Sequence, residues 1–149
     1  MRKRCTGSGT MTAKLLADYY IDHRDEELMQ GLVSAGALVA LADGRVEAVE
    51  RDELVNFIDR QRLVPAISRH DIAEAFDKRV LELEDRDSVR VIIETLRPLA
   101  GQSLASVVIR TAERVAAADR HIHPGELQAL QLIRLIMIAT SPPVAPRPS

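Results

Sequence analysis

Tryptophan is absent from this 149-residue chain, and aromatic residues make up only 3% of it. A chain of this length can nevertheless bury a substantial core, and hydrophobic residues account for 46% of the sequence. That core must therefore be built mainly from Leu, Ile, Val and Ala. Glycine is scarce, and apolar residues recur every three or four positions over long segments. Together these features predict an all-α protein.

Other absences narrow the class of protein. The single cysteine, Cys5, excludes an intramolecular disulfide and is typical of a reducing compartment. We find neither a run of eighteen apolar residues nor the apolar core of a signal peptide, so neither a membrane span nor a secretory signal is predicted. The net charge is −2 with both signs interspersed, which argues against a nucleic-acid-binding surface. We therefore expect a cytoplasmic protein.

Three parts are expected along the chain. Residues 1–11 are expected to form a flexible arm, residues 12–140 a single helical domain, and residues 141–149 a disordered tail. The tail carries four prolines in nine residues, and proline is incompatible with the interior of a helix or sheet.

Apolar spacing and capping residues predict a compact bundle of about seven helices. The first is expected to end near Tyr20, and Asp25 is the expected N-cap of the second. Gly44 is expected to end that second helix in a left-handed conformation. The residues expected to begin or cap the later helices are Ala48, Ser68, Asp87, Ser103 and Pro124. The last helix is apolar almost all round, so it is either central or contacts a partner or a second copy.

A helix–turn–helix pattern occurs twice. The first copy starts at Gly31 and reads GLVSAGALVALADGRVEAVERDELVNFI; the second starts at Val107 and reads VVIRTAERVAAADRHIHPGELQALQLI. In each turn a glutamate follows an aspartate by seven residues, as Asp43 and Glu50 and as Asp119 and Glu126. Two copies are too few for a solenoid. The duplication instead predicts two halves packed about a pseudo-two-fold axis.

The acidic turns allow two interpretations, and the first is structural. Glu50 and Glu126 fall near the third position of a helix, where a carboxylate accepts backbone N–H groups and opposes the helix dipole. Asp43 and Asp119 can satisfy amides of the turns. Each such role contributes on the order of 1 kcal/mol.

The second interpretation is a shared metal site. If the pseudo-two-fold brings both turns to one end of the bundle, four carboxylates converge and repel each other unless protons or a cation neutralise them. Oxygen ligands suit calcium, magnesium or manganese, and imidazoles extend the choice to zinc. The further candidate ligands are Glu47, His121 and His123. The spacing excludes an EF-hand, which requires a longer loop with ligands at fixed positions.

Catalytic signatures are missing. The sequence contains no glycine-rich phosphate loop, HExxH, CxxC or GxSxG motif. We therefore expect a protein that is not an enzyme and has no organic cofactor.

The two quoted segments resemble the paired DG…E motifs of the TerB family of bacterial tellurite-resistance proteins, over roughly Gln30 to Ile138. The resemblance implies an all-helical, pseudo-two-fold domain with a role in tellurite resistance and other stress responses. It also implies a divalent-metal site at the matching turn residues, which are Asp43, Gly44, Glu50, Asp119 and Glu126. An integral-membrane Ter partner at the inner face of the membrane is implied as well, which would place the protein peripherally there.

The second turn departs from the family pattern. Arg120 stands where the family usually has glycine, and Pro124-Gly125 stands where acidic residues are common. The second turn is therefore less acidic than the first.

Overall fold

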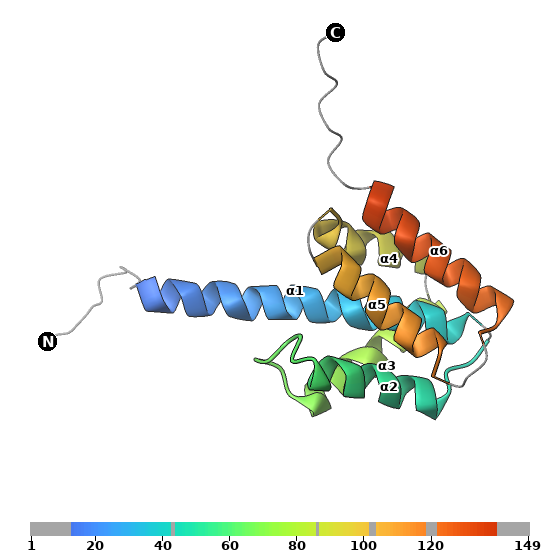
Figure 1. The fold of residues 1–149 in the computed structure, drawn as a ribbon, viewed down its shortest axis with the longest axis horizontal. Coiled ribbons are helices and arrows are strands. Elements are labelled where there is room, and N and C mark those ends of the chain that lie inside the picture. The colour runs from blue at the N-terminus through green and yellow to red at the C-terminus, as the bar shows by residue number, and fades with distance from the viewer. Residues whose placement is uncertain (1–12, 43, 86, 102–103, 119–121, 140–149) are drawn as a thin grey trace, which may run out of the picture.

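The computed structural model describes residues 13–42, 44–85, 87–101, 104–118 and 122–139, with side chains described from residue 24 onward. Within these ranges every regular element is helical, which confirms the all-α prediction (Figure 1). The elements are α1 (Ala13–Leu41), α2 (Ala48–Arg60), α3 (Arg69–Asp85), α4 (Ser88–Leu96), the 3₁₀ turn η1 (Arg97–Leu99), α5 (Leu104–Ala116) and α6 (Pro124–Ala139). The expected N-terminal arm and proline-rich tail lie outside the described residues.

The first two predicted helices are a single helix, so the described ranges contain six α-helices instead of about seven. Asp25, the expected N-cap, lies inside α1 and is buried. The backbone N–H of Ala66 donates to its Oδ2 at 2.9 Å. No glycine or proline interrupts residues 13–30, so nothing in the backbone ends the helix there. The carboxylate binds the loop after α2 instead of capping a helix.

Helix α1 is the axis of the fold. It contacts α3, α4, α5 and α6, and Figure 1 shows these helices gathered around its C-terminal half. Small residues of α1 permit close approach of its neighbours: a Cβ on Gly36 would lie 3.0 Å from Leu54 Cδ1. Among the residues with described side chains, the core is aliphatic apart from Phe57, Phe76, Met29 and Met137. Its fully buried large apolar side chains are Leu32, Val33, Leu54, Ile58, Ile72, Phe76, Ile92, Leu96, Leu99 and Ile133.

The two repeated units pack as the duplication predicts. The first helices of the units, α1 and α5, pack against each other, while α2 contacts α5 and α6 contacts α1. This exchange of neighbours is what a pseudo-two-fold relation between α1–α2 and α5–α6 requires.

Local sequence signals for helix ends are confirmed. Gly44 has φ +104° and its N–H donates to the carbonyl of Leu41 at 3.0 Å, a left-handed conformation that glycine adopts without strain. Ser68 Oγ accepts from the N–H of Asp71 at 3.1 Å at the start of α3. Asp87 is the N-cap of α4.

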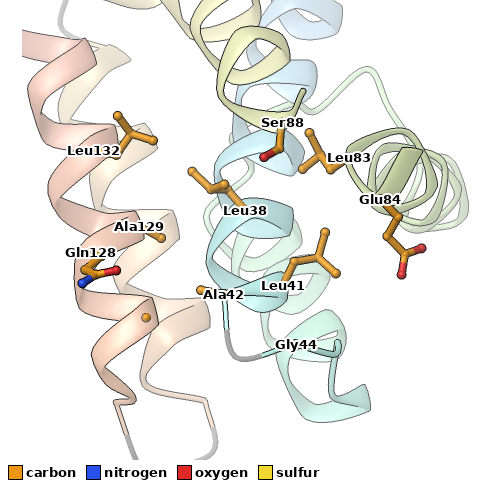
Figure 2. A pocket seen from close by; sticks show the side chains of 11 residues that line it. Leu38, Leu41, Ala42, Gly44, Leu83, Glu84, Ser88, Gln128, Ala129 and Leu132 are labelled. Atoms are coloured by element: carbon orange, nitrogen blue, oxygen red, sulfur yellow. The ribbon is translucent and has the colours of Figure 1, made fainter. Parts of the chain in front are cut away.

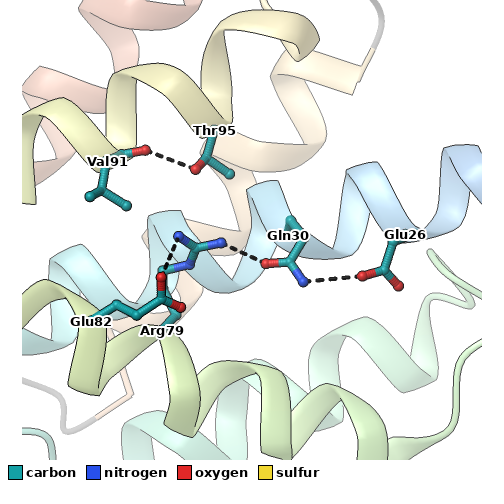
Figure 3. Close-up of polar contacts among 6 residues, drawn as sticks. All are labelled: Glu26, Gln30, Arg79, Glu82, Val91 and Thr95. Atoms are coloured by element: carbon teal, nitrogen blue, oxygen red, sulfur yellow. Dashed lines mark hydrogen bonds and ion pairs between the residues drawn. The ribbon is translucent and has the colours of Figure 1, made fainter.

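A polar chain ties α3 to α1 beside the core. The half-buried Arg79 donates from Nη2 to Gln30 Oε1 at 2.7 Å, and Gln30 donates onward to Glu26 Oε1 at 3.2 Å (Figure 3). Arg79 Nη1 also lies 3.8 Å from Glu82 Oε2. A second link, from Arg51 to both carboxylate oxygens of Asp77, joins α2 to α3. These contacts fix α3 against α1 and α2.

The face of α6 that points away from the core is partly apolar. Leu130, Ile133 and Met137, on the inner face of α6, are buried. Leu127, in the first turn of α6, is 49% exposed. Leu135 and Ile138 are 63% and 69% exposed. No helix in the described part of the chain combines the length and apolar character that a membrane span requires.

Replacing Asp25 with alanine should destabilise the fold. The change removes the hydrogen bond from the Ala66 N–H to the buried Asp25 carboxylate, and a hydrogen bond to a charged group contributes roughly 1.5–3 kcal/mol of unfolding free energy. Glu27→Ala, at an exposed neighbouring position of α1, should change it by less than about 0.5 kcal/mol. Urea denaturation of both variants checks this. Equal effects would show that the Asp25–Ala66 contact does not stabilise the fold.

Candidate cation site at the paired acidic turns

The two acidic turns lie at the same end of the molecule. In Figure 1, α1 and α5 end, and α2 and α6 begin, at the right-hand end of the bundle. The turns are also in direct contact, since a Cβ on Gly125 would lie only 2.5 Å from the carbonyl oxygen of Ala42. Ala42 precedes Asp43, and Gly125 precedes Glu126. The contact therefore brings together the backbone segments that carry two of the candidate ligands, Asp43 and Glu126.

Glu50 and Glu126 occupy equivalent positions in the two units. Both are fully buried. Oε1 of Glu50 accepts from the N–H of Glu47, and Oε1 of Glu126 accepts from the N–H of His123, each at 2.8 Å. Each glutamate thus binds the N–H three residues earlier, at the start of its own helix. The structural interpretation of these two glutamates is confirmed.

One carboxylate oxygen in the second turn is not accounted for by capping. Oε2 of Glu126 is buried and accepts no hydrogen bond from any described residue. A carboxylate oxygen removed from water without a partner is costly, and a proton or a cation offsets that cost. The chemistry of this buried group therefore fits a cation ligand.

The other candidates are placed less centrally. Glu47 is partly exposed and its Oε1 lies 3.1 Å from Arg45 Nε, so it forms an ion pair at the margin of the first turn. His123 is half-buried and contributes its backbone N–H to Glu126. Asp43, Asp119 and His121 lie outside the described residues. Within the described ranges, no three His, Cys, Asp or Glu side chains form a group that could hold a metal ion.

Gly125 is the residue of this site that the sequence did not reveal as important. It was noted only as a departure from an acidic pattern. Glycine is unfavourable in a helix, so its presence in the first turn of α6 is the one sequence feature that indicates a special role for Gly125. Glycine is needed at position 125 because the backbone of Ala42 approaches it closely. The two residues are 83 positions apart in the chain, so local sequence does not reveal this contact.

Comparison with protein families decides the assignment. The family model described as "Tellurite resistance protein TerB" matches residues 29–139. The chain belongs to the TerB family. The match covers both acidic turns and the intervening helices, in agreement with the range over which the motifs resemble the family. No curated protein and no solved structure matches the chain.

Gly125→Ala should destabilise this TerB-family protein. Alanine ordinarily favours a helix over glycine by about 0.5–1 kcal/mol, but here its Cβ meets a backbone carbonyl that must move. We expect a net loss of roughly 1–3 kcal/mol. Val49 occupies the equivalent position in α2 and is 45% exposed, so Val49→Ala is the matched control and should have little effect. A Gly125→Ala protein as stable as the parent in thermal denaturation would contradict the close contact.

Proposed function

We propose that this TerB-family protein binds a divalent cation at its paired acidic turns and acts, without catalysing a reaction, in the tellurite-resistance or stress response of its cell. The observation that carries the proposal is the contact of Ala42 with Gly125, which makes the two turns neighbours. The buried, unsatisfied Oε2 of Glu126 adds a group that a cation would neutralise.

The proposed ligands are Asp43 and Glu50 from the first turn and Asp119 and Glu126 from the second. Glu50 and Glu126 would use oxygens not required for capping, because in each glutamate Oε1 already binds the backbone. A site of carboxylates favours calcium, magnesium or manganese, and His121 or His123 would extend it to zinc. Tellurite is itself an anion, so an acidic site is a poor direct binder of it. The proposed role in resistance is therefore indirect, and the proposed location is the cytoplasm.

Thermal denaturation tests this proposal. A ligand that binds only the native state stabilises it, by about 2.7 kcal/mol at a hundred times its Kd. We expect one of Ca²⁺, Mg²⁺, Mn²⁺ or Zn²⁺ to raise the Tm above that in EDTA. The rise should disappear in Asp43→Asn/Asp119→Asn and persist in the control Asp52→Asn/Asp85→Asn, which alters exposed acids outside the turns. No rise with any of these ions at millimolar concentration would refute the proposal.

A second candidate function is favoured by the exposed apolar side chains of α6. In this alternative the acidic turns serve only as helix caps, and the protein is a scaffold that docks an integral-membrane Ter-type partner at the inner membrane face. Leu135 and Ile138 are 63% and 69% exposed, which leaves them available for such a contact or for a homodimer. Exposed apolar side chains that gather on one surface mark interaction sites.

Substitution of these side chains tests the alternative. Leu135→Ala/Ile138→Ala should reduce cosedimentation with inner-membrane vesicles, or dissociate a homodimer in analytical ultracentrifugation, while leaving the Tm nearly unchanged. Leu81→Ala is the control, because Leu81 is 64% exposed on α3. Unchanged association in the double variant rules out this surface.

A further inference from the structure

A groove runs beside the paired turns, between the C-terminal turns of α1, the first half of α6 and the junction of α3 with α4. Its volume is about 480 Å³. Figure 2 shows leucine side chains from α1, α3 and α6 around this space. The apolar side chains that line it are Leu38, Leu41, Ala42, Leu83, Ala129 and Leu132. We call this surface the α1–α6 groove.

The rim of the α1–α6 groove is acidic. Glu84 is the charged side chain among the described lining residues, and it is exposed and makes no ion pair with any described residue. Asp85 follows Glu84 in the chain and is also exposed. Arg86, which separates Asp85 from Asp87, lies outside the described residues. No arginine or lysine lines the groove among the residues that the structure describes. Its electrostatics therefore favour a positively charged occupant.

The length of the groove fits a short helical segment. Its α6 wall runs from Gly125 to Leu132, a rise of roughly 10 Å or two helical turns at 1.5 Å per residue. A helix that docks in a groove presents apolar side chains at i, i+3 or i+4, and i+7, which spans the same two turns. An apolar floor with an acidic rim complements a helix with an apolar stripe and basic flanks.

We propose that the α1–α6 groove binds an amphipathic helix of a partner protein, with Lys or Arg beside its apolar stripe. The apolar stripe contacts Leu38, Leu83 and Leu132, and a basic side chain pairs with Glu84. A second copy of this chain is a poorer occupant through α6, because Arg134, the basic residue on the described α6, already pairs with Glu113. The proposal does not depend on the cation, since these contacts involve none of the proposed ligands.

Fluorescence anisotropy with the full chain tests the proposal. The probe is a labelled eighteen-residue helical peptide of leucine and lysine, with leucine at the i, i+3, i+4, i+7 spacing. We expect saturable binding at one peptide per chain, and no binding of the same peptide with glutamate in place of lysine. Glu84→Lys should weaken binding about tenfold, because charge reversal places like charges together. Asp52→Lys makes the same change of net charge at an exposed site of α2 and should weaken binding less than about twofold.

The apolar floor needs its own variants. Leu132→Glu should abolish binding, whereas Leu81→Glu and Ile138→Glu, at exposed positions outside the groove, should not. Because Leu132 is half-buried, its variant is used only if its far-ultraviolet circular dichroism matches the parent. Amide NMR shifts of the parent protein on addition of the peptide locate the binding site without any substitution. They should cluster at Leu38, Leu83 and Leu132.

Four results would overturn the proposal. Equal weakening by Glu84→Lys and Asp52→Lys would show non-specific attraction to an acidic surface. NMR shifts centred on Leu135 and Ile138 would place the peptide on the outer face of α6. Shifts of groove residues on removal of residues 140–149 would identify the chain's own tail as occupant. Shifts that depend on protein concentration alone would identify a second copy.

Discussion

The close approach of Ala42 to Gly125 is the constraint on which the acidic end depends. At 2.5 Å from the carbonyl oxygen of Ala42, a Cβ has no room, so the start of α6 lies against the end of α1 only because residue 125 is glycine. That contact sets the relative position of the two turns and forms the end of the α1–α6 groove. It also orients α6, whose inner face then buries Leu130, Ile133 and Met137.

The buried glutamates show that the structural and metal-binding interpretations of the turns are compatible. A single oxygen of each glutamate suffices to bind the N-cap backbone, and each carboxylate then opposes the positive end of its own helix dipole. In the second turn the remaining oxygen of Glu126 is buried without a hydrogen bond from the described residues. A capping role explains why a carboxylate lies at this position, while the second oxygen motivates the proposed cation.

The features that could be predicted from the sequence are those that depend on local chemistry or on repetition. Helix ends could be predicted at Ser68, Asp87 and Gly44, because each of these residues acts through a contact within three residues of itself. The duplication predicted the common position of the turns. Asp25 was misassigned because its partner, Ala66, lies 41 residues away, and a local pattern cannot distinguish a capping aspartate from one that binds a distant amide. Gly125 and the α1–α6 groove escaped prediction for the same reason, because both arise where distant helices meet.

The proposed ligands come from both turns and form one site, so the stoichiometry of cation binding tests the proposal most directly. Isothermal titration calorimetry of the metal-free full chain with Ca²⁺, Mg²⁺, Mn²⁺ and Zn²⁺ in turn should show one ion bound per chain for the preferred cation. Asp43→Asn and Asp119→Asn should each abolish that binding, since each removes a ligand of the same ion. Two independent ions per chain, each lost in only one variant, would contradict a shared site, and an absence of binding by all four ions would leave Glu50 and Glu126 as helix caps alone.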